Sequence, residues 1–273
     1  MLMYIYRKWL LNTKNVVALI GLAFINSIIV NKMYTVYEQS GQPFCIWESG
    51  IMTLNSGLIV VVLSVIFVML MSNYPDTASD FYYCEIRTGR KCWYWCQMLF
   101  SVLGIITYMA VVLGFSAVRT EKISFAANGW SLNISNYGQK YALTSYIPLQ
   151  LFNQMPPIKA YILSCVLLFS YLFFIMSVQM FGFVLGKKKQ ALIINIIFLT
   201  AGVCASFFKS RIMFAFPFCH SVLWLHYDKY FKKSDWGTYW SIAILLLTGI
   251  LIFGLSYRLF LRADIDKMKE EGT

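Results

Sequence analysis

The chain has 273 residues, of which 59% are hydrophobic and only 13% are charged, and its formal net charge is +11. A soluble domain carries about 25% charged residues, so this composition excludes an ordinary soluble enzyme with a water-facing cleft. The positive charge is typical of membrane proteins, whose cytoplasmic loops contact anionic headgroups. No concentrated basic stripe with interleaved aromatic residues is present, and nucleic acid is therefore not an expected partner.

Six long apolar segments without a charged residue in their cores predict membrane-spanning helices. A helix of about 20 residues crosses a hydrocarbon layer of about 30 Å, and only helices or closed barrels satisfy every backbone polar group there. We therefore predict an all-α membrane protein with one transmembrane domain over residues 1–273. The expected spans are Val16–Val30, Ile51–Met71, Trp95–Val118, Ile158–Gly186, Gln190–Phe207 and Tyr239–Tyr257.

The N-terminal residues 1–14 have the pattern of an amphipathic helix. Ile5 and Trp9 would share an apolar face with Leu2, Tyr6 and Leu10, whereas Arg7, Lys8, Asn12 and Asn15 would share the opposite, polar face. This pattern favours a helix that lies in the membrane interface before the first span. A basic flank that merely orients the first span explains the same residues, and the sequence leaves both interpretations open.

The segment between the second and third spans carries helix signals of its own. Thr77 and Asp80 fit a capping box, and Gly89 can end the helix in the left-handed conformation. We therefore predict a short helix over residues 77–88 on the inner side. A capped, charged helix suits the docking of a partner protein, although a solvated interfacial helix without a partner would have the same pattern.

The distribution of lysine and arginine predicts that both termini are cytoplasmic in a multi-pass protein of the cell membrane. Six spans place both termini on one side, and basic residues are dense in the short segments of that side. The third inner connection, 186–190, is so short that the fourth and fifth spans must form a tight hairpin. The basic residues assigned to this side are Arg7, Lys8, Lys14, Arg87, Arg90, Lys91, Lys187, Lys188, Lys189, Arg258, Arg262, Lys267 and Lys269.

A seventh apolar stretch, Ile212–Leu225, is interrupted by Pro217 and has only 14 residues. It is too short to cross comfortably, so we expect a re-entrant outer segment between the fifth and sixth spans. If it crossed instead, the C-terminus would move outside, against the basic residues of the C-terminal region.

Catalytic and metal-binding motifs are not evident, and we expect no catalytic residue, no metal and no cofactor in this chain. The sequence lacks a phosphate-binding loop and the common hydrolase motifs. No Asp or Glu lies inside the six predicted spans, which argues against a proton-coupled carrier. His220, His226 and Asp228 are close in sequence, but ordinary polar loop residues explain them better than a metal site. A disulfide between Cys45 and Cys219 is left open.

Polar residues within the predicted spans are amides. Gln179 and Asn195 would lie at similar depths on the two arms of the tight hairpin, where they could face each other. Hydrogen bonding between helices explains such residues, and a substrate pathway is the alternative. The candidate pathway residues are Asn26, Asn55, Gln179 and Asn195.

The order of these elements resembles the membrane subunit of an ABC-2-type transporter. That family has an interfacial N-terminal helix, six spans, a cytoplasmic coupling helix between spans two and three, and short re-entrant helices between spans five and six. Residues 80–97 match the family's frequent order of an acidic residue, a basic residue with Gly, and an aromatic start to span three. The resemblance covers nearly the whole chain, through architecture more than through one motif.

The resemblance implies that two such subunits, identical or homologous, form the pathway and that two ABC ATPase subunits supply ATP hydrolysis with their own ATP and Mg²⁺. Most compact members are bacterial exporters of peptides, antibiotics or lipid-linked glycans. For this apolar bundle we expect an amphipathic or hydrophobic substrate such as an antimicrobial peptide. The ATPase-docking residues would be Asp76, Asp80, Glu85, Arg87, Arg90 and Lys91.

A second function class is a membrane immunity or sensor protein that binds a peptide without an ATPase. The sequence does not determine the substrate, the transport direction, or whether the permease pair is identical.

Overall fold

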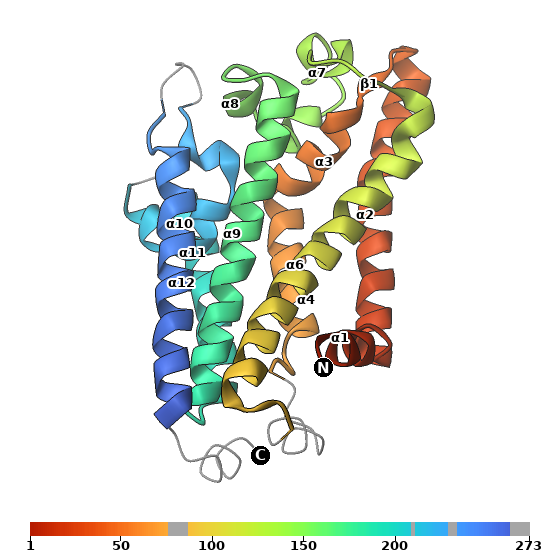
Figure 1. Ribbon diagram of the computed structural model, residues 1–273. Helices are drawn as coiled ribbons and strands as arrows, with labels where there is room; N and C mark the ends of the chain where they lie inside the picture. Colours follow the sequence, from red (N-terminus) through yellow and green to blue (C-terminus); the bar gives the residue numbers. More distant parts are fainter. Residues whose placement is uncertain (76–86, 209–210, 229–233, 263–273) are drawn as a thin grey trace.

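The computed structural model describes residues 1–75, 87–208, 211–228 and 234–262. Five of its helices are long and apolar enough to cross a membrane, and they run side by side in a bundle (Figure 1). The prediction of a multi-pass helical membrane protein is confirmed at this level. The five helices are α2 (Thr13–Ser40), α6 (Arg90–Thr120), α9 (Pro157–Val184), α10 (Lys188–Phe208) and α12 (Thr238–Arg262).

The predicted second span is broken, which the apolar pattern did not indicate. Helices α3 (Ile46–Asn55) and α4 (Gly57–Leu70) meet at an angle of 75°, so the bundle has six spans only if this pair counts as one. Ser56 at the junction is extended, with φ −69° and ψ 118°. The Asn55 side chain donates to the Ile51 carbonyl oxygen at 3.1 Å, and such local bonding competes with the regular helical pattern.

Helix α1 (Leu2–Leu10) lies across the ends of the long helices (Figure 1). Ile5 is buried, the hydroxyls of Tyr6 and Thr107 are hydrogen-bonded at 2.7 Å, and Trp9 packs edge-on against Phe100. The apolar face expected from the sequence therefore rests on α6.

Asn15 does not belong to the exposed polar face predicted for the N-terminal residues. It is buried, and its amide nitrogen donates to the Trp9 carbonyl oxygen at 2.6 Å. Asn12 instead caps α2, because its side-chain oxygen accepts from the Lys14 backbone N–H. The chain turns sharply between α1 and α2, and this turn places Asn15 inside.

The connection between α6 and α9 forms a compact cap over the opposite end of the bundle (Figure 1). Strand β1 (Phe44–Cys45) pairs in parallel with β2 (Ser124–Phe125), with Phe44 opposite Ser124. Short helical turns make up the rest of the cap: η1 (Glu121–Ile123), α7 (Leu132–Ser135), η2 (Leu143–Ser145) and α8 (Leu149–Phe152).

Glu48 corrects the expectation that every carboxylate lies outside the spans. It is in the first turn of α3, within the bent pair, and is fully buried. Its carboxylate accepts from the Cys45 N–H at 2.9 Å and from the Ser131 N–H at 2.7 Å. Glu48 therefore ties α3 to the cap, and its contacts with two backbone amides indicate a structural role.

Residues 211–226 form three short helical turns, η3 (Arg211–Ala215), α11 (Pro217–Ser221) and η4 (Leu223–His226). None of them is long enough to cross a membrane, and they pack against α9, α10 and α12. Residues 211–226 therefore contain no membrane-crossing helix, which is compatible with the expected re-entrant segment.

Cys45 and Cys219 do not form a disulfide. The Cys45 thiol donates to the Ala127 carbonyl oxygen, whereas the Cys219 thiol donates to the Gly202 carbonyl oxygen. Both are therefore buried thiols in different parts of the molecule.

Helix α9 is the central element of the bundle. In its most apolar window 61% of residues are buried, against 22–33% in the other four long helices. It packs most closely with α12, where Phe173 lies 5.2 Å from Phe253 between ring centroids, and also contacts α3 and α10. Any rearrangement of the bundle must therefore move neighbours relative to α9.

Candidate functional site

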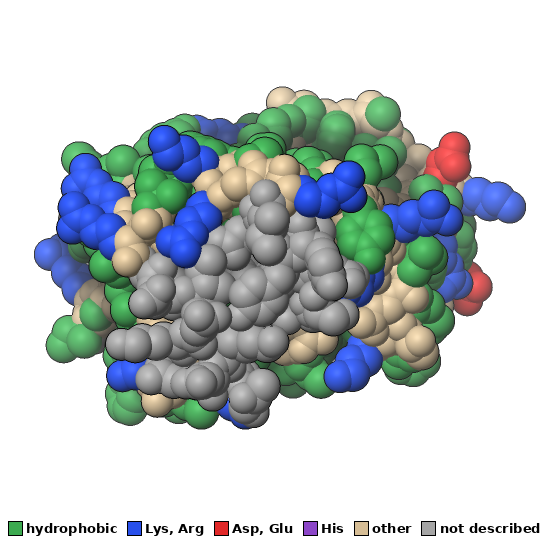
Figure 2. Space-filling view, turned by 60° about the horizontal axis from the view of Figure 1, so that its bottom comes forward, with side chains coloured by type: hydrophobic (Ala, Val, Ile, Leu, Met, Phe, Trp, Pro, Cys, Tyr) green, Lys and Arg blue, Asp and Glu red, His purple; other side chains and the backbone are tan. Residues whose placement is uncertain are grey.

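Basic residues gather at one end of the bundle, which we call the basic end. This end contains α1, the described ends of the connection from α4 to α6, the α9–α10 turn and the last turns of α12. Figure 2 shows lysine and arginine side chains across this end. The five carboxylates among the described residues belong to elements of the other end (Figure 1). The described cations of the basic end are Arg7, Lys8, Lys14, Arg87, Arg90, Lys91, Lys187, Lys188, Lys189, Arg258 and Arg262.

The α9–α10 turn holds the start of the connection between α4 and α6. The Lys188 ammonium group donates to the carbonyl oxygens of Asn73 and Pro75, each at 2.8 Å. Gly186 has φ +72°, and the Lys187 N–H donates to the Gly182 carbonyl oxygen at 2.8 Å, which ends α9 in the left-handed manner that favours glycine. The sharp turn thereby presents Lys188 to the connecting segment.

The other end of this connection is held by α1 and by aromatic packing. The Thr88 hydroxyl donates to the Met1 sulfur at 3.4 Å. At the start of α6, Trp93 stacks on Phe260 of α12 at 5.1 Å and lies 5.8 Å from Phe183 of α9. The Tyr94 hydroxyl donates to the Phe253 carbonyl oxygen at 2.7 Å. A displacement of residues 87–91 would therefore also move Trp93 and Tyr94, which contact α9 and α12.

The residues predicted to dock an ATPase fall partly within the described structure. Asp76, Asp80 and Glu85 lie outside the described residues, as does most of the helix predicted over 77–88. Of the remainder, Arg87 and Lys91 are exposed and Arg90 is half-buried at the start of α6. All three belong to the basic end.

The four amides predicted as pathway residues are all buried, but they occupy different helix interfaces. Asn26 of α2 donates to the Val112 carbonyl oxygen of α6 at 2.8 Å, and Asn55 donates to the Ser164 hydroxyl of α9 at 2.9 Å. Asn195 of α10 donates to the Ile175 carbonyl oxygen of α9 at 3.2 Å. These contacts are interhelical hydrogen bonds of the kind that hold membrane bundles together.

Gln179 is the exception among these amides. Its side chain is fully buried, and neither its nitrogen nor its oxygen has a hydrogen-bond partner. Gln179 and Asn195, which the sequence allowed to face each other, are not hydrogen-bonded, because the Asn195 amide nitrogen donates to the α9 backbone one turn away. A buried amide without partners is costly, and Gln179 is the member of the set that packing explains least.

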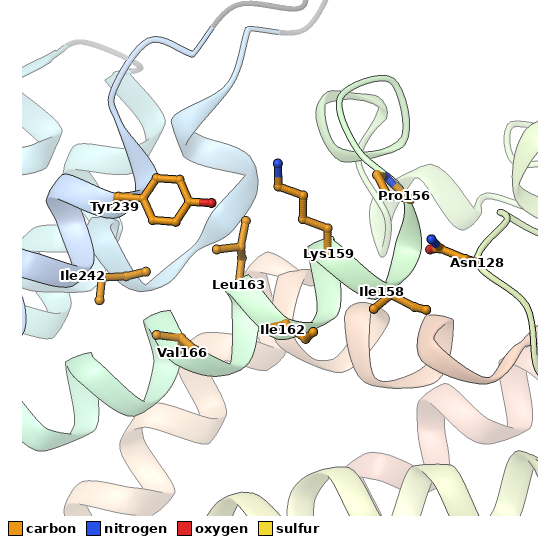
Figure 3. A pocket seen from close by; sticks show the side chains of 9 residues that line it. All are labelled: Asn128, Pro156, Ile158, Lys159, Ile162, Leu163, Val166, Tyr239 and Ile242. Carbon is orange, nitrogen blue, oxygen red and sulfur yellow. The ribbon is translucent and has the colours of Figure 1, made fainter.

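A groove opens between α9 and α12 near the opposite end of the bundle, with a cavity volume of about 470 Å³. Figure 3 shows Ile162, Val166 and Ile242 along its apolar wall, with Lys159 and Tyr239 beside its mouth. One ammonium group above an apolar surface fits an amphipathic molecule with an anionic group. Lys159 is the third residue of α9 and is not among the site residues expected from the sequence.

The two histidines of the 211–226 segment are buried, contrary to the expectation of ordinary polar loop residues. They lie on either side of Ser241 of α12. Asp228 does not join them in a metal site: the described part of the chain contains no cluster of three metal-ligating side chains.

Comparison of the chain with protein-family models, with curated proteins and with solved structures gave no match. The candidate sites therefore rest on the geometry of this chain alone.

Proposed function

We propose that the chain is the membrane subunit of an ABC-2-type exporter, in which separate ATPase subunits dock on the basic end. In this arrangement the basic end faces the cytoplasm, as expected for short loops rich in lysine and arginine. Helix α1 lies in the inner interface, and the 211–226 segment lies in the outer leaflet. A second permease subunit, identical or homologous, completes the pathway.

The observation that carries this proposal is the way the α4–α6 connection is held at both of its ends. At the start of the connection, Lys188 donates to the carbonyl oxygens of Asn73 and Pro75. Just after its end, Trp93 and Tyr94 of α6 contact α9 and α12. A loop with no task beyond joining two helices does not need such attachment. A segment that receives force from a docked partner does.

In the proposed mechanism the partner subunits hydrolyse ATP, and this chain transmits the resulting movement to its own helices. ATP, with Mg²⁺, supplies the driving free energy in the ATPase subunits. The described side chains Arg87, Arg90 and Lys91 offer charge to an acidic partner surface. Movement of the connection would then shift Trp93 against Phe183 and Phe260, and this shift would change how α9 and α12 pack.

The groove between α9 and α12 favours an amphipathic or hydrophobic substrate. It opens on the side of the bundle and combines an apolar wall with the Lys159 ammonium group. A molecule that already lies in the membrane could enter there without crossing an aqueous channel. A change in α9–α12 packing would widen or close the same groove.

Affinity purification from the native membrane tests the docking step. The tagged chain, extracted in a mild detergent, is expected to retain an ABC ATPase that mass spectrometry identifies. The double substitution Arg87→Glu, Arg90→Glu should reduce the retained ATPase at least about tenfold, since like charges at an interface cost several kcal/mol. Lys122→Glu at the opposite end is the matched control and should retain the wild-type amount.

Two results would contradict the proposal. One is a chain that purifies without any ATPase under conditions where it remains folded, as an immunity protein would. The other is equal retention of the ATPase by the Arg87 and Arg90 double variant and by wild type, which would place docking elsewhere.

A further inference from the structure

A cluster of two imidazoles and one hydroxyl joins the 211–226 segment to α12. Ser241 Oγ lies 2.7 Å from His220 Nδ1 and 2.8 Å from His226 Nε2. The remaining ring nitrogens face backbone carbonyls: His220 Nε2 is 2.7 Å from the Phe214 oxygen, and His226 Nδ1 is 3.1 Å from the Val222 oxygen and 3.2 Å from the Leu223 oxygen. Ser241 and His226 are fully buried, and His220 is 3% exposed.

Counting protons shows that this network is incomplete when both histidines are neutral. A carbonyl oxygen only accepts, so the proton of neutral His220 must be on Nε2 and that of neutral His226 on Nδ1. His220 Nδ1 and His226 Nε2 are then both acceptors, and both face the same hydroxyl. Ser241 has one proton and can donate to only one of them. The other contact brings two lone pairs together at hydrogen-bond distance.

We propose that His220, Ser241 and His226 form a proton-binding site, in which one proton from solvent completes the hydrogen bonds between the 211–226 segment and α12. The proton binds to the imidazole nitrogen that lacks a donor. This nitrogen then donates to Ser241 Oγ, while the Ser241 hydroxyl donates to the other imidazole. Each of the four ring nitrogens then has one proton between it and its partner. The added proton forms one new N–H bond, and no bond between heavy atoms changes.

The surroundings determine where this site titrates. Burial lowers the pKa of His220. Burial, together with the charge of His220, lowers the pKa of His226 to about 4. Within the described residues, no carboxylate contributes to either histidine pKa. The described titratable groups of the chain segment around the pair are Arg211, Cys219, Tyr227, Asp228 and Asp235. The helices packed against this segment carry Lys159, Tyr161, Cys165 and Tyr171 on α9, Lys188, Lys189 and Cys204 on α10, and Tyr239, Tyr257, Arg258 and Arg262 on α12.

The sign of the pH effect follows from these shifts. Unfolded histidine has a pKa near 6.5, so between that pH and about 4 the unfolded chain binds protons that the folded chain resists. The pair therefore contributes its full stability above pH 6.5 and loses it as the pH falls. Ser241 limits this loss, because its oxygen is the acceptor for the added proton. A second proton would place two cations on one hydroxyl, so the pair should bind one proton before the other.

Nitrogen NMR of ¹⁵N-histidine-labelled protein in detergent micelles tests this site, because the chain has only two histidines. At pH 7.5 the spectrum should contain one Nε2–H tautomer and one Nδ1–H tautomer. Lowering the pH should produce one imidazolium equivalent per chain, with a midpoint below 6.5 and with both rings shifting together. Two independent titrations near 6.5, or two rings with the same tautomer, would overturn the proposal.

Ser241→Ala tests the role of the hydroxyl. Without the acceptor for the imidazolium N–H, the midpoint should fall by about one unit or more. Ser256→Ala is the matched control: Ser256 is a buried serine fifteen residues further along the same helix, and its hydroxyl donates to the Ile252 carbonyl oxygen at 2.7 Å. It should keep the wild-type midpoint. An unchanged midpoint in folded Ser241→Ala contradicts the site, and if that variant fails to fold, the wild-type tautomers and proton count decide.

Discussion

Buried polar side chains are the residues at which the sequence says least about structure. The amides were recognised as exceptional from their positions inside apolar segments, but which backbone they bond depends on how the helices pack. Asn195 reaches the α9 backbone rather than Gln179. Glu48 precedes the predicted span that begins at Ile51, yet it is buried in α3 and two backbone amides donate to its carboxyl group. Hydropathy reports the average environment of a segment and misses a single buried carboxyl group whose hydrogen bonds are satisfied.

Gln179→Leu is expected to stabilise the folded protein. The substitution removes an amide that has no partner and keeps a side chain of similar size, so the free energy of unfolding should rise by about 1 kcal/mol. Asn195→Leu removes a real hydrogen bond and should lower it by about 0.6 kcal/mol. Thermal unfolding in one detergent compares the two variants.

Transport provides an independent measurement for the same residues. If Gln179 contacts substrate in the proposed exporter, Gln179→Leu and the double variant with Asn195→Leu should lose transport while remaining folded. A destabilised Gln179→Leu variant would show instead that the amide has a partner in the membrane.

Helices were predicted well where their ends carry signals of their own. Pro157 starts α9 and Gly186 follows its end, so the expected Ile158–Gly186 span nearly coincides with the helix. Helix α2 extends to Ser40, ten residues beyond the predicted span. A search for apolar runs misses these last residues, because many of them are polar. The bend at Ser56 and the cap at 121–156 depend on contacts between distant segments, and no local pattern specifies them.

Close packing in the α9–α10 hairpin gives a test at the level of elements. A Cβ atom at Gly182 would overlap the Ala191 Cβ and lie 3.2 Å from the Lys187 carbonyl oxygen. Gly182→Ala must therefore push the two helices apart, and it should lower the free energy of unfolding by about 1–3 kcal/mol.

Gly254→Ala is the matched control for this hairpin. No atom lies within 4 Å of a Cβ at Gly254 in α12, so this variant should be unchanged or up to about 1 kcal/mol more stable. Chemical unfolding in the same detergent separates the two variants. Equal stabilities would mean that the hairpin is looser than described.

The described part of the molecule differs between the two ends of the bundle. Eleven of its basic side chains belong to the basic end (Figure 2), whereas the β1–β2 pair and the cap lie at the opposite end (Figure 1). The sequence predicted the helical class and the clustering of charge, because both follow from local composition. It did not predict the groove beside Lys159, which arises only where α9 and α12 separate.

Transport into inside-out vesicles tests the proposed function most directly. Vesicles that contain this chain and its co-purifying ATPase are incubated with a fluorescently labelled amphipathic peptide, with and without ATP. The exporter account predicts that peptide accumulates inside only with ATP, and that vanadate or the Arg87→Glu, Arg90→Glu variant abolishes accumulation. Peptide that binds the vesicles equally with and without ATP, and never enters the lumen, would contradict this account and favour a binding protein that works without an ATPase.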